Sequence, residues 1–212
     1  MTGARAVIVG GGRVAARKAA LLLSSGLRLA VVSPELSGLL AAMNEDGAIE
    51  WIPRKYMRGD LQGAAIAVAA TSSRETNSLV AAEAREMRIL ANVADRPSEG
   101  SCTFPALLRR GALEVAVSTG GRSPAMASHV KGIISGIIDE HYGTALELLS
   151  EVREKLLTHE DSEKYNISLL RDLMDQGLME HLRNRDRGSA STLVREALEK
   201  LGVTTEESQK AE

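Results

Sequence analysis

A glycine-rich turn between two apolar runs near the N-terminus constrains the fold of this chain most. Residues 6–9 read Ala-Val-Ile-Val, Gly10-Gly11-Gly12 follow, and an alanine- and leucine-rich run extends to Ser25. From Gly10 to Ala15 the spacing is Gly-x-Gly-x-x-Ala, the dinucleotide-binding fingerprint with alanine in its third position. We therefore expect a strand, a sharp turn and a helix that begins at the turn.

Each position of this fingerprint has a physical reason. Gly10 lets the chain turn sharply out of the strand, and Gly12 has no Cβ, so its backbone can approach a pyrophosphate. Ala15 is small enough for the helix to pack on the strand, and the N–H groups at the helix start attract phosphates. Glu35 ends the next apolar run, at the offset of about 20 residues expected of a carboxylate that binds a ribose hydroxyl. The alternative is a glycine-rich turn in an α/β domain that binds no ligand.

Strands alternate with helices over the first 95 residues, which predicts an α/β fold with a doubly wound, Rossmann-type parallel sheet. We expect strands at residues 5–9, 27–33, 48–52, 64–70 and 89–93, and helices at residues 13–25, 37–44 and 74–87. Right-handed crossovers place the carboxyl ends of all five strands at one edge of the sheet. Gly10, Glu35, Thr71 and Asp95 should lie on that edge, where such sheets bind ligands.

The pattern changes after residue 103. Two apolar runs at residues 104–108 and 113–118 flank a turn at residues 109–112 and predict a β-hairpin. Pro124 suits the first position of a helix that we expect to end near His141. Leucines at helical spacing then predict helices from Thr144 onward, interrupted by a polar break at residues 183–189 and closed by a short helix at residues 192–201.

These patterns divide the chain into four predicted regions. They are a dinucleotide-binding domain at residues 1–103, a dimerisation segment at 104–141, a helical domain at 142–202 and a disordered tail at 203–212. The hairpin and its helix are too small to bury their own apolar faces, since an isolated hairpin is marginal in water. We therefore expect a homodimer.

Composition excludes several classes of function. The chain has 26 basic and 28 acidic residues, and its one Trp, three Tyr and one Phe leave little for base stacking in nucleic-acid binding. A single cysteine, Cys102, excludes a disulfide framework and a Cys-based zinc site, and the four histidines show no metal-ligand spacing, so we predict no metal site. No apolar run is long enough to span a membrane, and the first strand leaves no room for a signal peptide. We expect a cytoplasmic protein that binds neither nucleic acid nor membrane.

Five motifs occur in order along the chain, at residues 9–18 (Val-Gly-Gly-Gly-Arg-Val-Ala-Ala-Arg-Lys), 68–71 (Val-Ala-Ala-Thr), 92–95 (Asn-Val-Ala-Asp), 104–106 (Phe-Pro-Ala) and 117–124 (Val-Ser-Thr-Gly-Gly-Arg-Ser-Pro). Over residues 5–140 they resemble the precorrin-2 dehydrogenase / sirohydrochlorin ferrochelatase family of siroheme biosynthesis. The resemblance implies NAD-dependent oxidation of precorrin-2 to sirohydrochlorin and, in bifunctional members, insertion of Fe²⁺ to give siroheme. It also implies a homodimer with the hairpin and the following helix in the interface.

The resemblance further implies roles for individual residues. Positions 13–14 and 34–35 match those with which the family holds NAD, so the expected cofactor-binding residues are Gly10, Gly12, Arg13, Val14, Pro34, Glu35 and Thr71. Asp95 matches the carboxylate that the family needs for both activities. Thr119 lies where some relatives carry a phosphorylatable serine. Fe²⁺ is expected as a substrate of chelation, not as a bound cofactor.

Asp95 can serve both reactions chemically. Oxidation of the tetrapyrrole removes a hydride, which NAD⁺ accepts, and a proton. Insertion of iron expels pyrrole protons, and a carboxylate at a strand end can accept a proton and attract a cation. The alternative is an aspartate that caps a local turn beside residues 96–97.

A substrate with many carboxylates should prefer a basic rim, and arginine pairs with carboxylates through two hydrogen bonds. The expected substrate-binding residues are Arg109, Arg110, Arg122 and Ser123, and residues 54–58 add a second basic cluster. Each arginine singly can instead be a solvated surface charge. Two alternatives to a bifunctional enzyme stay open, namely an NAD-sensing regulatory module without catalysis and a chelatase that no longer oxidises its substrate.

Overall fold

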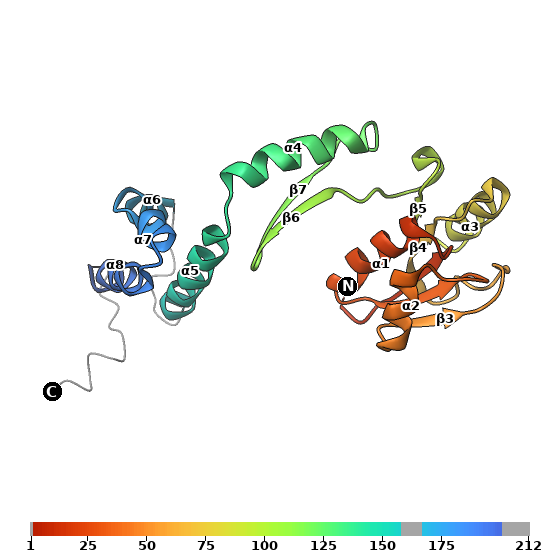
Figure 1. Ribbon diagram of the computed structural model, residues 1–212, viewed down its shortest axis with the longest axis horizontal. Coiled ribbons are helices and arrows are strands. Elements are labelled where there is room, and N and C mark those ends of the chain that lie inside the picture. Colours follow the sequence, from red (N-terminus) through yellow and green to blue (C-terminus); the bar gives the residue numbers. More distant parts are fainter. Residues whose placement is uncertain (1, 158–166, 201–212) are drawn as a thin grey trace. The chain divides into compact units, whose positions relative to one another are not determined.

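The computed structural model describes residues 2–157 and 167–200 (Figure 1). The chain divides into two compact units, residues Met1–Phe104 and Pro105–Glu212. No helix among the described residues is long and apolar enough to cross a membrane.

The first unit is built on a five-stranded sheet in the order β3-β2-β1-β4-β5, with every neighbouring pair parallel. The predicted doubly wound parallel sheet is thus confirmed. Val9 at the end of β1 pairs with Val32 of β2 and with Ala69 of β4, so the carboxyl ends of these strands are aligned. The strands are β1 (Arg5–Val9), β2 (Arg28–Val32), β3 (Ile49–Ile52), β4 (Ala64–Ala69) and β5 (Leu90–Val93).

Helices cover both faces of this sheet and create two cores. Along β1 the side chains alternate, so Ala6 and Ile8 join the core under α1 and α2, whereas Val7 and Val9 join the core under α3. A fully buried aliphatic side chain such as that of Ile8 stabilises the fold by about 1.5–3 kcal/mol. The elements are α1 (Arg13–Ser24), α2 (Gly38–Glu45), α3 (Arg74–Glu86) and the 3₁₀ turn η1 (Pro97–Glu99).

The second unit begins with an antiparallel hairpin of β6 (Ala106–Arg110) and β7 (Leu113–Val117). The predicted hairpin is present, but its turn is residues 111–112, not 109–112. Gly111 takes a positive φ of 56° there, a conformation that suits glycine, so the turn needs only two residues. Arg109 and Arg110 therefore lie in β6 and not in the turn.

The other described elements of the second unit are helices: α4 (Pro124–Ile137), α5 (His141–Leu157), α6 (Ile167–Asp175), α7 (Leu178–Arg183) and α8 (Arg187–Lys200). The expectation that α4 ends near His141 is wrong, because Ile138 leaves the helical region and the Asp139 carboxylate accepts the His141 N–H at 3.1 Å, where α5 begins. The predicted polar break at residues 183–189 is also too long. The Asp186 carboxylate accepts the Ser189 N–H at 2.9 Å, so α8 begins at Arg187 instead of residue 192.

A separate core joins the C-terminal helices, and its buried members include Leu148, Leu173, Leu178, Leu182, Val194 and Leu198. An ion pair of 2.8 Å between Arg183 Nε and Asp139 Oδ2 ties α7 to the start of α5. Helix α5 also packs on the hairpin, because a Cβ on Gly143 would lie only 2.6 Å from the Arg110 carbonyl oxygen. The predicted tail at residues 203–212 lies outside the described residues.

Candidate functional site

The glycine turn after β1 packs tightly against its neighbours in the first unit. Gly10 has a φ of 125°, and a Cβ there would lie 2.4 Å from the Ala70 carbonyl oxygen. A Cβ on Gly11 would lie 1.8 Å from the Glu35 carbonyl oxygen. The Gly11 carbonyl in turn accepts the Ser37 N–H at 2.7 Å. The fold itself therefore demands glycine at residues 10 and 11, and Gly11 was not among the predicted site residues.

Gly12 differs, because a Cβ there would meet no protein atom within 4 Å. It is the N-cap of α1, where no side chain accepts a hydrogen bond from the first turn and where that turn carries no acidic residue. The N–H groups of Arg13 and Val14 at this helix start keep the partial positive charge of the helix dipole. The residues present thus fit a phosphate group that approaches the backbone at Gly12.

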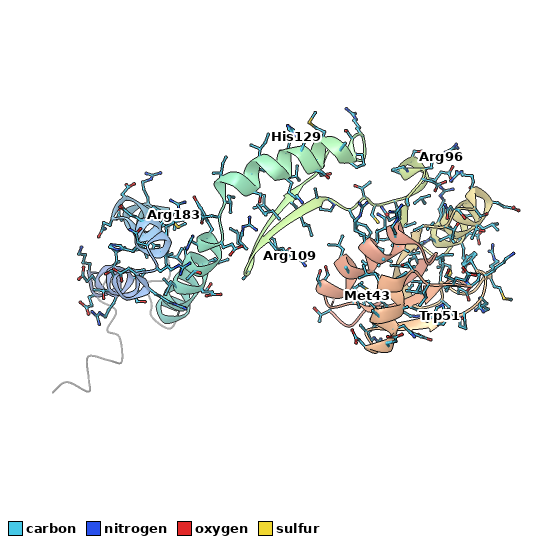
Figure 2. The ribbon with its side chains drawn as sticks, in the orientation of Figure 1. Met43, Trp51, Arg96, Arg109, His129 and Arg183 are labelled. Atoms are coloured by element: carbon cyan, nitrogen blue, oxygen red, sulfur yellow. The ribbon has the colours of Figure 1, made fainter. Side chains whose placement is uncertain are left out.

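The loop after β2 places Pro34 and Glu35 at the surface beside the glycine turn. Ser33 Oγ donates to the Glu35 carbonyl at 2.7 Å, and the Trp51 indole N–H donates to the Ser33 carbonyl at 2.9 Å. Trp51 lies on the edge strand β3 (Figure 2). Within the described part of the chain the Glu35 carboxylate has no hydrogen-bond or ion-pair partner, so it can accept hydroxyl groups of a ribose.

Thr71, directly after β4, is bound to a buried amide in α3. The Thr71 N–H and Oγ1 donate to Asn77 Oδ1 at 3.1 and 2.8 Å, and the Asn77 side chain is 1% exposed. Ser73 Oγ caps α3 by accepting the Thr76 N–H at 3.2 Å. Gly10 approaches the backbone of Ala70, the residue before Thr71. The Asn77 amide therefore binds the residue next to the one that the glycine turn packs against.

Asp95 follows β5 and keeps a side chain that is 38% exposed. Its Oδ1 accepts the Asn77 Nδ2–H at 2.9 Å, and its Oδ2 lies 3.3 Å from Arg74 Nη1. Among the described residues no backbone N–H donates to this carboxylate, whereas an aspartate that caps a turn accepts one. Arg74 also pairs with Glu99, which in turn pairs with Arg96 at 3.4 Å.

Asn77 and Arg74 were not predicted from the sequence as residues of the site. The available signal was their position at the start of the helix that follows Thr71, because α3 runs between the strands that carry Thr71 and Asp95. The exposed ion pair of Arg74 is worth about 1 kcal/mol or less, so the buried Asn77 is the firmer link to Asp95.

The predicted substrate-binding residues lie in the second unit. Arg109 pairs with Glu114 across the hairpin, and Arg109 projects from β6 in Figure 2. Arg110 Nε donates to the Ile138 carbonyl at 3.0 Å and Nη2 donates to Ser135 Oγ at 2.9 Å, so its guanidinium holds the end of α4. The basic cluster at residues 54–58 is likewise engaged, since Arg54 pairs with Asp60 and Arg58 with Glu86.

The turn before α4 brings together three of the residues singled out from the sequence. Ser123 Oγ accepts the Met126 N–H at 3.2 Å and so caps α4, while Thr119 Oγ1 accepts the Ser123 N–H at 3.1 Å. Arg122 between them is exposed, and its guanidinium has no partner among the described residues. Of the predicted arginines, Arg122 is therefore the one whose whole guanidinium is left for a ligand, as far as the described residues go.

The described residues contain no group of three His, Cys, Asp or Glu side chains placed to hold a metal ion. Cys102 lies beside Lys18, whose ammonium sits 4.7 Å from the centre of the Phe104 ring. Burial raises the pKa of the Cys102 thiol, which keeps it in the less nucleophilic protonated form.

Known proteins resemble this chain along both units. A family described as "Putative NAD(P)-binding" matches residues 1–106. Siroheme synthase 3 of Aeromonas hydrophila is 39% identical over 150 residues, which are 71% of this chain and 32% of that protein. The siroheme synthase of Chromobacterium violaceum is 41% identical over 150 residues, with the same coverage of 71% and 32%.

A solved structure titled "SirC, precorrin-2 dehydrogenase" covers 95% of this chain and 95% of its own chain, with a TM-score of 0.69 and 26% identity. By contrast, the chain spans about a third of the length of the siroheme synthases. The likeness to the solved structure thus extends through the second unit, beyond the part that the family model matches.

Proposed function

Because the chain belongs to the precorrin-2 dehydrogenase family, we propose that it oxidises precorrin-2 to sirohydrochlorin with NAD⁺ in siroheme biosynthesis. One run of contacts supports this proposal. Gly10 packs on Ala70, Thr71 follows Ala70, Asn77 binds Thr71, and Asp95 binds Asn77. These contacts connect the Asp95 carboxylate to the glycine turn that fits a dinucleotide.

In this reaction the first unit binds the cofactor and receives a proton. The N–H groups at the start of α1 bind the pyrophosphate, with Arg13 and Val14 beside it, and Glu35 in its loop after Pro34 accepts ribose hydroxyls. NAD⁺, when bound, supplies the acceptor for the hydride. Asp95 accepts the proton that leaves the substrate: each of its oxygens holds one protein donor, and a carboxylate oxygen can accept a second hydrogen bond.

We extend the proposal to insertion of Fe²⁺ into the oxidised product. Chelation releases pyrrole protons and needs a group that can take them, and Asp95 is partly exposed and acidic. In this step iron is a substrate. The proposal of iron insertion is also supported by the resemblance of the chain to family members that carry out both reactions.

Recognition of the substrate carboxylates falls to the basic residues of the second unit in this proposal. Arg122 is the first candidate, because its guanidinium is exposed and lacks a partner among the described residues, and Ser123 lies next to it. Arg109 and Arg110 can contribute only by sharing or giving up their present partners, Glu114 and the end of α4. Arginine suits this task because its planar fork matches a carboxylate.

We also propose a symmetric homodimer through the hairpin and α4. On α4 the large apolar side chains of Met126, Ile133 and Ile137 are 53%, 55% and 66% exposed. Their spacing of seven and four residues places them on one face of the helix. Such a face is costly to leave in water, and a second copy of the same segment can cover it. The predicted division into a dimerisation segment and a helical domain follows from this proposal.

An anaerobic assay tests the proposed function. Purified protein, precorrin-2 and NAD⁺ should yield NADH and sirohydrochlorin in equal amounts, and later addition of Fe²⁺ should produce siroheme faster than in buffer. Siroheme formation without NADH would favour a chelatase that no longer oxidises. Binding of NAD⁺ without either reaction would favour an NAD-sensing module.

A further inference from the structure

We infer that Asn77 is a positioning residue that fixes the Asp95 carboxylate against the end of β4; this inference rests on the proposed function of Asp95. Asn77 lies in α3, between the two strands whose ends carry Thr71 and Asp95. Its side chain bonds to both of these residues. It therefore acts on the reaction through Asp95 and touches no reacting atom itself.

The orientation of the Asn77 amide follows from its partners. Oδ1 accepts the Thr71 N–H at 3.1 Å, and a backbone N–H can only donate. A flipped amide would place its NH₂ group against that N–H, so Nδ2 must face the other way. There it donates to Asp95 Oδ1 at 2.9 Å and to the Thr71 carbonyl at 3.2 Å.

Burial makes this orientation rigid. Asn77 is 1% exposed, so its amide has no water to replace a lost protein partner, and an unsatisfied buried amide is costly. The other contact of Asp95 is different, because the Arg74 guanidinium is 38% exposed, lies 3.3 Å away and is shared with Glu99. Asn77 therefore determines where Oδ1 lies, and Oδ2 keeps the more adaptable contact.

A purely structural role would limit Asn77 to holding the turn after β4 through Thr71. The substitution Asn77→Asp separates the two roles. The new carboxylate can still accept the Thr71 N–H and hydroxyl, so the turn keeps these two bonds and loses only the 3.2 Å bond to the Thr71 carbonyl. When ionised it cannot donate to Asp95, and it puts a second negative charge beside that carboxylate. Two such carboxylates share a proton, which raises the apparent pKa of the pair.

The test compares pH profiles of NADH formation by the wild type and by Asn77→Asp. We expect the acidic limb of kcat to move to higher pH by about one unit or more. The value of kcat at pH 7 should fall by about 10- to 100-fold, while the KM for NAD⁺ stays within about twofold. An acidic limb that does not move would overturn the inference, since loss of stability alone leaves it in place.

The matched control is Glu83→Gln on the same helix. Glu83 is 3% exposed and binds Tyr56 and the Gly59 N–H, so its loss lowers the melting temperature without touching Asp95. Its acidic limb should match the wild type. If Asn77→Asp does not fold, Asn77→Ala replaces it: kcat should fall about tenfold at constant KM for NAD⁺, and an unchanged kcat overturns the inference.

A second measurement keeps the inference independent of the assay. Carbon-13 NMR of protein labelled at the aspartate carboxyl groups, with Asp95 assigned by its loss in Asp95→Asn, should show the raised apparent pKa of the carboxyl pair in Asn77→Asp. If the wild type forms no NADH but the pKa rises, the proposed function fails and the contact stands. If NADH forms but the pKa does not rise, the positioning role fails and the proposed function stands.

Discussion

The backbones of Gly11 and Glu35 approach so closely that a Cβ on Gly11 would lie 1.8 Å from the Glu35 carbonyl oxygen. This approach fixes the loop after β2 against the turn after β1. The carboxylate expected to bind ribose is thereby tied to the backbone expected to bind pyrophosphate. Neighbouring Gly12 has no such contact, since a Cβ there would meet no protein atom within 4 Å.

Substitution of Gly11 should therefore lower the stability of the protein, whereas substitution of Gly12 should weaken cofactor binding. Gly11→Ala must displace the Glu35 backbone, so we expect it to lower the free energy of unfolding of the cofactor-free protein by about 1–3 kcal/mol. Gly12→Ala should leave that stability within about 0.5 kcal/mol but weaken NAD⁺ binding at least tenfold, because its Cβ takes the place of the pyrophosphate. Urea denaturation and calorimetric titration measure the two quantities. Equal loss of stability in both variants would contradict the assignment of Gly12 to the ligand.

The cofactor should be NAD⁺ and not NADP⁺. The Glu35 carboxylate attracts a ribose hydroxyl and repels a 2′-phosphate, and neither Ser33 nor Pro34 supplies a positive charge beside it. Glu35→Gln should reduce the preference by weakening NAD⁺ binding and improving NADP⁺ binding. Calorimetry with both cofactors checks this, and tighter binding of NADP⁺ to the wild type would refute it.

The sequence predicted the sheet well because its signals are local. Each apolar run is bounded by a glycine or a polar turn, and the fingerprint at residues 10–15 specifies strand, turn and helix together. The parallel order then follows from the alternation with helices. For the same reason, Gly10, Glu35, Thr71 and Asp95 could be assigned to one edge before any contact was known.

What the sequence could not predict depends on contacts between distant residues. Asn77 reads as an ordinary polar residue of an amphipathic helix, and only the sheet order places it between Thr71 and Asp95. Arg110 reads as a free basic residue, yet its guanidinium holds the end of α4. The early start of α8 depends on one aspartate cap within a polar stretch that also suits a loop.

If the proposed dimer forms, a single substitution in its interface should convert the protein from a dimer to a monomer. Ile133 lies on the exposed apolar face of α4 and is 55% exposed in one chain, so Ile133→Asp should not disturb the fold of the chain. A charge buried between two copies is costly, and the substitution should raise the dissociation constant at least 100-fold. Light scattering at micromolar concentration should give a dimer for the wild type and a monomer for the variant. A monomeric wild type would contradict the proposed interface.

The loop after β3 should make the first unit sensitive to acid. Two hydrogen bonds from Arg54, at 2.6 and 2.8 Å, hold the pKa of Asp60 below its ordinary value, with help from the Met57 N–H. A carboxyl group whose folded-state pKa is lowered stabilises the fold above its unfolded-state pKa, and this stabilisation is lost as the pH falls through the folded-state value. The stability of the wild type should thus decline below about pH 4, where unfolded aspartates take up protons.

Asp60→Asn isolates this contribution. The amide cannot form the ion pair, so the variant should be less stable at pH 7 and should lose less stability between neutral pH and pH 3 than the wild type. Urea denaturation across this range measures both curves. Parallel curves would show that Asp60 does not contribute to the acid sensitivity.

The proton-accepting role of Asp95 predicts that Asp95→Asn damages chemistry and spares the fold. The amide oxygen of the variant can still accept the Asn77 Nδ2–H, so the buried contact survives. Only the exposed contact with Arg74 is lost, and such pairs contribute about 1 kcal/mol or less. Removal of a positioned general base typically costs about 10²–10⁴ in rate.

We therefore expect NADH formation and Fe²⁺ insertion to fall together in Asp95→Asn, with NAD⁺ affinity within a few fold of the wild type and little change in melting temperature. Arg74→Gln is the matched control, because it removes the same exposed ion pair but leaves the carboxylate and its bond to Asn77. It should keep most of the activity. Near-normal turnover of Asp95→Asn in both assays would exclude Asp95 as the base, and loss of one activity alone would mean that the two reactions use different proton acceptors.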